Sequence, residues 1–427
     1  MSALAQPMPR LLRPVGPPLG LYFRPGRNDH TAFLALLAEG HTDMSGLVLS
    51  ASSEARHAEL RTEAQRHGLE TVLDPRSVEL ATPGGIALGG VAQLPWAGEH
   101  LPHSPEHLGG AHAIAVAERL ARHVVANRYS AVLAMTHYIA NVRDPWLAVD
   151  QELVHALRRA LDAADGQDVC IYYPLSVPSA LLRIPEHRAR LIDTLTTLPI
   201  DALWLRVQGF GTTSSGPLSL RRYIEACRDL HRLGIPLVGE RTGTVGLALL
   251  AFGAVGGIES GVTLGERYDV QGLLKGPSSG TPFSPPPRVY IPSIGAFLAR
   301  AQANELFEHR RMAALFGCRV AGCCRNGIRG MNADPRRHFL LRRTSEVSSY
   351  GAPPEPLRPG LYLEEFLRPA TDLALRAARV LPALEPTQRR LEGWRNTLGA
   401  LHRQGPPTTV AVVPEGKRIR PRKQMGA

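Results

Sequence analysis

The chain has 427 residues, of which 44% are hydrophobic and 20% charged, and this composition excludes a largely disordered protein. Its 49 lysines and arginines outnumber 38 aspartates and glutamates, giving a net charge of +11 carried mostly by arginine. Guanidinium groups suit a polyanionic partner, but GC-rich codon usage explains the same arginine content equally well. The longest apolar run, at residues 244–258, is too short to cross a membrane, and the N-terminus has no secretory pattern. We therefore expect a cytoplasmic protein with no membrane contact.

Short apolar runs alternate with amphipathic helical patterns through the first 260 residues. The runs predict eight strands, at residues 19–23, 46–50, 71–74, 131–136, 169–174, 202–207, 235–240 and 255–259. Strands that alternate with helices favour parallel pairing, and eight of them fit a closed (β/α)8 barrel. An open doubly wound sheet is the alternative, but no glycine-rich phosphate loop follows the first strand. We predict a TIM-like (β/α)8 barrel over residues 19–275.

The rest of the chain predicts smaller units around the barrel. Residues 1–18 are rich in proline and predict a flexible N-terminus. Residues 276–350 predict a linker followed by a zinc-binding module, and residues 351–405 predict C-terminal helices. Residues 406–427 are polar and strongly basic, which is typical of a disordered tail.

Five cysteines are too few for a disulfide framework in a chain of this length. Cys170 and Cys227 fall in apolar patterns and are expected in the core. The other three cysteines and one histidine follow the pattern Cys-x4-Cys-Cys-x13-His, as Cys318, Cys323, Cys324 and His338. Three thiolates and an imidazole form a closed tetrahedral set that is typical of structural zinc. The alternative is a group of buried cysteines beside an unrelated histidine.

Polar side chains stand at the ends of several predicted strands. They are Asp74, His137, Arg206, Gln208, Glu240, Arg241 and Glu259. In a barrel these ends open on one face, where substrates bind, and carboxylates that converge with arginines suit nucleophilic or acid–base chemistry. The alternative is a salt-bridge layer that caps the barrel. Gly256 and Gly257, beside the eighth strand, would let a ligand approach the backbone closely.

The order of these features resembles the tRNA-guanine transglycosylase superfamily, including its DNA-modifying paralogues. The resemblance lies in residues 46–75, which end in LETVLDP, in DALWLRVQGFG, in IPLVGERTGTVGLALLAFGAVGGIESG and in the cysteine–histidine cluster. It implies a barrel followed by a structural zinc module. It also implies that Asp74 takes the place of the active-site aspartate, that Glu259 lies near the nucleophile, and that Gln208 and Gly209 contact the base.

The implied activity is transglycosylation of a purine in RNA, DNA or a nucleoside. The carboxylate of Glu259 would attack the ribose anomeric carbon, Asp74 would handle the proton, and a modified purine would then displace the enzyme. Two alternatives stay open. One is a non-catalytic nucleic-acid-binding subunit with the same barrel and zinc module, favoured because the family's nucleophile is aspartate rather than glutamate. The other is a small-molecule TIM-barrel enzyme. The oligomeric state is open.

Overall fold

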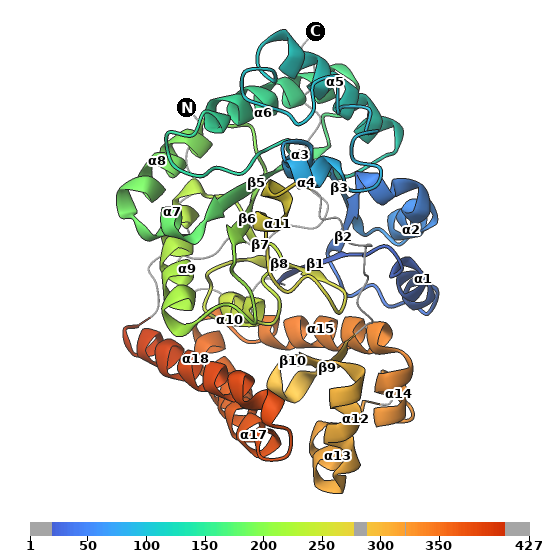
Figure 1. The fold of residues 1–427 in the computed structure, drawn as a ribbon, viewed down its shortest axis with the longest axis vertical. Coiled ribbons are helices and arrows are strands. Elements are labelled where there is room, and N and C mark those ends of the chain that lie inside the picture. The colour runs from blue at the N-terminus through green and yellow to red at the C-terminus, as the bar shows by residue number, and fades with distance from the viewer. Residues whose placement is uncertain (1–18, 277–287, 321, 406–427) are drawn as a thin grey trace.

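The computed structural model describes residues 19–276, 288–320 and 322–405. Its centre is a closed barrel of eight parallel strands joined in chain order (Figure 1). The strands are β1 (Gly20–Arg24), β2 (Gly46–Ser50), β3 (Glu70–Asp74), β4 (Ala131–Leu133), β5 (Cys170–Pro178), β6 (Ala202–Gln208), β7 (Leu237–Gly239) and β8 (Gly257–Gly261). The barrel closes where β1 pairs with β8, with Tyr22 opposite Glu259. The predicted (β/α)8 barrel is confirmed.

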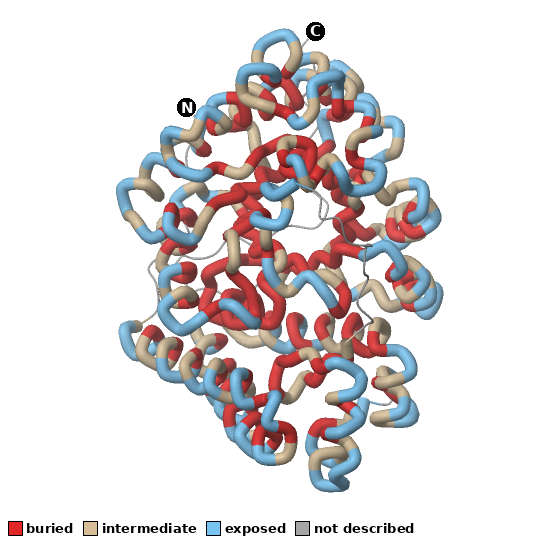
Figure 2. The backbone as a smooth tube through the Cα atoms, in the orientation of Figure 1, coloured by how far each residue is buried: buried red, intermediate tan, exposed pale blue. Residues whose placement is uncertain are grey.

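Helices on the outside of the barrel connect the strands. The longer ones are α1 (His30–Ala38), α2 (Glu54–Arg66), α5 (Ala111–Ala126), α6 (Trp146–Ala163), α8 (Pro185–Thr196), α9 (Pro217–Leu230) and α10 (Val245–Ala251). Four short helices lie in the loops: α3 (Ser77–Leu80), α4 (Pro83–Ile86), α7 (Ser179–Arg183) and α11 (Gln271–Leu274). Helix α10 is buried along its whole length, whereas α5 buries one face, with Val116, Leu120 and Val124 (Figure 2). This spacing of three to four residues is the period of an amphipathic helix.

The interior of the barrel is built in layers, because every second residue of a strand points inward. An apolar layer comprises Tyr22, Val48, Val72, Ala131, Leu133, Tyr172, Ala202, Trp204 and Val238. Four residues of this layer are each followed, two positions later in the chain, by a buried charged side chain. These charged residues are Arg24, Asp74, Arg206 and Glu240. Glu70, the first residue of β3, lies at the opposite end of the barrel and accepts hydrogen bonds from the hydroxyls of Tyr22, at 3.1 Å, and Tyr172. Because every second side chain of a strand points inward, these four charged side chains meet at the C-terminal mouth of the barrel.

The C-terminal third of the chain packs against one side of the barrel (Figure 1). It begins with an antiparallel pair, β9 (Val289–Ile291) and β10 (Ala296–Leu298). The helices that follow are α12 (Arg300–Glu308), α13 (Arg310–Phe316), α14 (Ile328–Ala333), α15 (Pro335–Gly351), α16 (Arg358–Leu361), α17 (Arg368–Ala378) and α18 (Glu385–Arg403). Helix α15 contacts α1 and α10, and α18 contacts α9. Within the predicted helical region 351–405, a π-helical segment, Tyr362–Leu367, leads into α17, whose first turn contains Pro369 and tolerates it.

Some predictions fall on parts of the chain outside the described residues. These are the flexible N-terminus, the basic tail and most of the glycine- and proline-rich linker. Among the described helices, none combines the length and apolarity needed to cross a bilayer. Cys227 is buried as predicted, whereas Cys170 is only half-buried, because it is the first residue of β5 and lies at the edge of the inner apolar layer.

Candidate functional site

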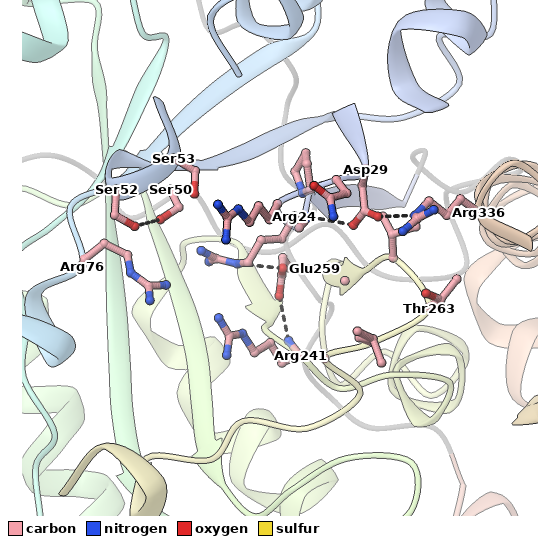
Figure 3. A pocket seen from close by; sticks show the side chains of 18 residues that line it. Arg24, Asp29, Ser50, Ser52, Ser53, Arg76, Arg241, Glu259, Thr263 and Arg336 are labelled. Atoms are coloured by element: carbon pink, nitrogen blue, oxygen red, sulfur yellow. Dashed lines mark hydrogen bonds and ion pairs between the residues drawn. The ribbon is translucent and has the colours of Figure 1, made fainter. Parts of the chain in front are cut away.

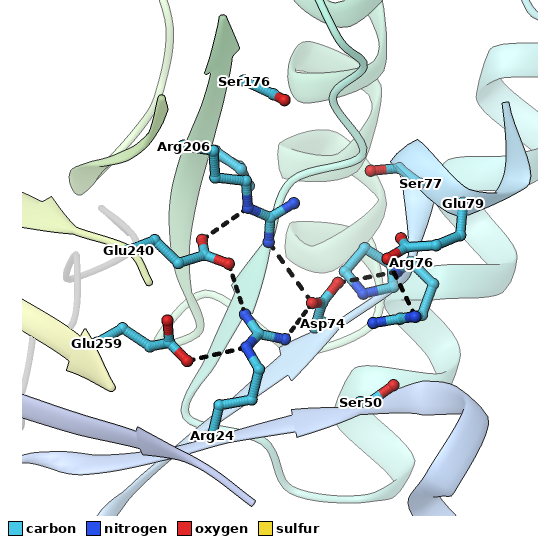
Figure 4. Close-up of polar contacts among 12 residues, drawn as sticks. Arg24, Ser50, Asp74, Arg76, Ser77, Glu79, Ser176, Arg206, Glu240 and Glu259 are labelled. Carbon is cyan, nitrogen blue, oxygen red and sulfur yellow. Dashed lines mark hydrogen bonds and ion pairs between the residues drawn. The ribbon is translucent and has the colours of Figure 1, made fainter. Parts of the chain in front are cut away.

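A layer of five charged side chains crosses the mouth of the barrel (Figure 4). Arg24, the last residue of β1, donates from Nε to Glu259 Oε1 at 3.0 Å and from Nη2 to Glu240 Oε1 at 2.8 Å. Its Nη1 binds Asp74 Oδ2. Arg206 adds a second cation, with its Nε 2.6 Å from Glu240 Oε2 and its Nη2 3.5 Å from Asp74 Oδ2. One guanidinium therefore joins three carboxylates that are far apart in the sequence.

Backbone amides complete the hydrogen bonding of two of these carboxylates. The N–H of Arg76 donates to Asp74 Oδ1, and the N–H of Arg241 donates to Glu259 Oε2, each at 2.9 Å. Arg76 and Arg241 reach these positions with φ angles of 63° and 52°, in the left-handed region that residues other than glycine seldom adopt. Every carboxylate oxygen of the layer thus has a donor, as burial of charge requires. The salt-bridge layer that stood as the alternative to a catalytic site is present, and it also fixes the orientation of Glu259.

The pKa values of Asp74 and Glu259 are shifted in opposite directions. Burial opposes ionisation of Asp74, but Arg24 and then Arg206 outweigh it and hold the pKa of Asp74 well below its usual range. Burial raises the pKa of Glu259, and Glu240 adds to this effect, while Arg24 opposes it. Asp74 is therefore held as a carboxylate. Glu259 therefore takes up a proton more readily than Asp74.

A cavity of about 340 Å³ opens beside this layer, at the ends of β1, β2 and β8 (Figure 3). Five arginines, two carboxylates and three serines contribute to its wall: Arg24, Arg27, Arg76, Arg241, Arg336, Asp29, Glu259, Ser50, Ser52 and Ser53. Glu259 faces this cavity, whereas Asp74, Arg206 and Glu240 do not line it. The cavity is thus positively charged, with one carboxylate of the layer at its inner wall.

Other residues that the sequence placed at the site have different surroundings. Both ends of the Gln208 amide are bound within the chain, since Nε2 donates to Asp269 and Oε1 accepts from the N–H of Val270. Gly209 follows directly with a φ of 72°. Gly256 directly precedes β8 and Gly257 is its first residue, so both lie at the N-terminal end of the strand, away from the mouth. These two glycines are therefore not where a ligand at the mouth would meet the backbone.

His137 follows β4 but is absent from the wall of the arginine-rich cavity. It is fully buried, and its ring stacks on Trp146 with centroids 3.7 Å apart. Its Nδ1 lies 2.6 Å from Asp150 Oδ1, and its backbone N–H donates to Asp150 Oδ2 at 2.9 Å. Asp150, in the helix α6 that follows β4, therefore holds His137 in a buried pair, and His137 does not line the cavity.

The predicted metal ligands lie together in the C-terminal part. Ligand atoms of Cys318, Cys323, Cys324 and His338 are all within 4.8 Å of one another. The Cys323 and Cys324 sulfurs are 3.8 Å apart, and each lies 3.4 Å from His338 Nδ1. Tetrahedral bonds of ordinary zinc length place two sulfurs about 3.8 Å apart and a sulfur and a nitrogen about 3.5 Å apart. The separations among Cys323, Cys324 and His338 match this geometry, and with Cys318 within 4.8 Å of them the four residues could hold one metal ion.

The surroundings of His338 fix which ring nitrogen faces this cluster. Its Nε2 lies 3.0 Å from the carbonyl oxygen of Tyr290, which leaves Nδ1 for the sulfurs. A second hydrogen bond of this kind orients most metal-binding histidines. His338 lies in the first turn of α15, which begins with Pro335 after the N-cap Asp334. The same turn carries Arg336, whose Nε is 2.6 Å from Asp29 Oδ1, so the cluster is tied to the mouth of the barrel.

Sequence reasoning missed several residues of the site. Arg24 was missed because the first strand was ended at residue 23, one residue short, although the same rule that selected Asp74 would have selected it. The serines after β2 and Arg76 after β3 also stand at strand ends. Arg336 had no such signal, because its place in the cavity depends on how α15 packs on α1.

No protein-family model matches the sequence, and no curated protein does. Similar solved structures include 3-dehydroquinate dehydratase from Enterococcus faecalis, with 10% identity over 62% of this chain and 96% of that chain and a TM-score of 0.34. A GH26 β-mannanase from Bacteroides ovatus has 11% identity over 61% and 85%, with a TM-score of 0.33. The carboxyl transferase domain of Rhizobium etli pyruvate carboxylase has 10% identity over 85% and 53%, with a TM-score of 0.37. These identities and TM-scores are too low to support any argument. The fold is established by the strand pairing within this chain.

Proposed function

We propose that this protein is a transglycosylase-like enzyme that exchanges a purine base in nucleic acid or in a nucleoside, with Glu259 as the carboxylate that attacks the sugar. The observation that carries the proposal is the position of Glu259. It lies in the wall of the cavity at the barrel mouth, its side chain has no exposed surface, and its two oxygens are held by Arg24 Nε and by the Arg241 N–H. A carboxylate fixed at the inner wall of a cavity is suited to nucleophilic catalysis.

In this scheme Glu259 attacks the anomeric carbon, a bond forms between its oxygen and the sugar, and the bond from the sugar to the base breaks. The departing base takes up a proton from solvent in this step; when the incoming purine then attacks the sugar, the bond from the sugar to Glu259 breaks and the purine releases a proton to solvent, so the exchange is balanced. Asp74 makes three contacts that keep it ionised and bound to Arg24. We therefore assign Asp74 to positioning Arg24, rather than to the proton transfer that the family resemblance implies.

The test is exchange of a radiolabelled purine into RNA, DNA and nucleosides by the purified full-length protein. Glu259→Gln is expected to abolish exchange, whereas Glu259→Asp, which keeps the charge, should retain a slow rate if the fold is intact by circular dichroism. Asp74→Asn is expected to lower the rate without abolishing it. Wild-type protein that exchanges no base with any of the three substrates would refute the proposal.

One observation favours a second candidate, a non-catalytic nucleic-acid-binding protein. Every carboxylate oxygen of the charged layer already has a donor, as in a purely structural cap of the barrel. This candidate predicts salt-sensitive binding of polynucleotide that is equal in wild type and in Glu259→Gln, with no base exchange. A small-molecule enzyme would instead bind mononucleosides or other small ligands and no polynucleotide at low salt.

We also propose that the cysteine–histidine cluster holds one structural zinc ion. Support comes from the sulfur and nitrogen separations, which fit tetrahedral zinc, and from the carbonyl that orients His338. The ion would connect the loop after α13 to the first turn of α15. Elemental analysis should find one zinc per chain in the wild type and in the control Cys227→Ala, and none in Cys324→Ser. Absence of zinc from wild-type protein purified without chelator would refute this assignment.

A further inference from the structure

We infer that the cavity at the barrel mouth is a phosphate-binding subsite formed around Arg27, Arg76 and Arg241. The inference rests on the proposed function only in naming the ligand as the phosphate of a nucleotide unit whose sugar lies against Glu259. Binding of the phosphate group itself requires no catalysis.

The guanidinium groups in this cavity differ in how far they are already neutralised. Arg24 is surrounded by three carboxylates, and Arg336 is paired with Asp29. Arg76 has one partner, Glu79, at 3.0 Å. Within the described ranges, Arg27 and Arg241 have no carboxylate at ion-pair distance, yet both line the cavity. Their positive charge is therefore available to an anion in the cavity.

The backbone also directs arginines into this space. Five residues other than glycine have left-handed φ angles among the described residues, and three of them line the cavity: Arg76, Arg241 and Thr263. Such conformations cost free energy and are concentrated at functional sites. At Arg76 and Arg241 the unusual backbone turns the N–H to a carboxylate of the charged layer. Figure 3 shows the side chains of Arg24, Arg76 and Arg241 extending into the same space from different elements.

The composition of the wall favours phosphate over a simpler anion. Several planar guanidinium groups can bind different oxygens of one phosphate, and Ser50, Ser52 and Ser53 add hydroxyls along one side, where those of Ser50 and Ser52 share a hydrogen bond at 3.1 Å. Glu259 repels an anion placed against it, so the phosphate belongs on the arginine and serine side, and an uncharged sugar belongs beside the carboxylate. A cavity of about 340 Å³ holds more than a phosphate alone.

The test compares two variants that each remove one positive charge and relieve one left-handed backbone. Arg241→Gly keeps the N–H that binds Glu259 but removes a guanidinium from the cavity. The control is Arg128→Gly, because Arg128 has a φ of 54° and is exposed, away from the cavity wall. Both variants should be at least as stable as the wild type, since glycine adopts this conformation without strain.

Binding is measured by calorimetry with inorganic phosphate, a purine nucleoside 5′-monophosphate and a short oligonucleotide without a terminal phosphate. We expect Arg241→Gly to lower affinity for phosphate and the mononucleotide at least about tenfold, and Arg128→Gly to change it less than twofold. Tighter binding of the mononucleotide identifies a terminal phosphate, and tighter binding of the oligonucleotide identifies a backbone phosphodiester. Equal affinities in the two variants, or no phosphate binding by the wild type, would overturn the inference.

The same experiment separates this inference from the proposed function. Glu259→Gln removes a negative charge from the cavity wall, so it should bind phosphate at least as tightly as the wild type. Phosphate binding without any base exchange would support the subsite and refute the enzyme. Base exchange that is unaffected by Arg241→Gly would support the enzyme and refute the subsite.

Discussion

Arg24 is the side chain on which the charged layer depends, so its replacement by methionine is the most informative stability test. Arg24→Met keeps the volume of the side chain but leaves Asp74, Glu240 and Glu259 without their shared cation, and all three carboxylates are buried. Removing one partner of a buried ion pair costs about 3–5 kcal/mol. With three carboxylates affected, we expect a loss at the upper end of that range at pH 7.

The size of this loss should depend on pH. The pKa of Asp74 is lowered in the folded wild type, so its contribution to stability is present above its unfolded pKa of about 3.9 and is lost as pH falls through the folded value. Without Arg24 the pKa values of the buried carboxylates rise, and protonation relieves their repulsion. The difference between wild type and Arg24→Met should therefore narrow as pH falls from 7 towards 4.

Urea unfolding followed by tryptophan fluorescence measures this difference, because Trp204 lies in the apolar layer beside Tyr22. The matched control is Arg389→Met, which breaks an exposed pair with Glu385 in α18 and should cost no more than about 0.5 kcal/mol. A loss below about 1 kcal/mol in Arg24→Met, or one that does not change with pH, would refute the view that Arg24 neutralises this layer.

Three further predictions concern other parts of the molecule. Burial raises the pKa of Glu70 to about 7 against hydrogen bonds from Tyr172 and Tyr22, so the folded state binds this proton more tightly than the unfolded chain. The contribution of Glu70 to the stability of the wild type should therefore fall by about 3 kcal/mol as pH rises from 4.5 to 7, and Glu70→Gln should lack this component. Curves of stability against pH that run parallel for the two proteins would contradict this prediction. A strong chelator should lower the unfolding temperature of the wild type. Cys324→Ser should already unfold at that lower temperature without chelator and should not respond to it. An unfolding temperature of Cys324→Ser equal to that of the wild type would exclude a structural metal. Asp150→Asn should lower the free energy of unfolding by about 1–3 kcal/mol, because an amide cannot accept both hydrogen bonds that His137 donates, and an unchanged urea midpoint would show that this pair contributes nothing.

The barrel was predictable because its signals are local. Each strand is a short apolar run, each helix has its own period, and parallel pairing in chain order follows from their alternation. The cysteine–histidine cluster was predictable for the same reason, since Cys318 to His338 span a short stretch of sequence. Asp74 and Glu259 came together because the inward-facing period of a strand continues to its end.

The wall of the cavity was less predictable because it depends on strand ends and on packing between distant elements. An error of one residue at the end of β1 hid Arg24. His137 met the strand-end rule, but Asp150 on the next helix binds it. Arg336 enters the cavity from α15, and nothing in its local sequence indicates that contact.

The central claim is that a reacting sugar meets Glu259 inside this cavity, and peptide mapping by mass spectrometry tests it most directly. Full-length protein is incubated with guanine-containing RNA, DNA or nucleoside, quenched in acid without an incoming base, and digested. The account predicts a sugar mass added to the peptide that contains Glu259, absent from Glu259→Gln and reduced in Arg241→Gly. An adduct on any other residue, or base release without an adduct, would contradict it.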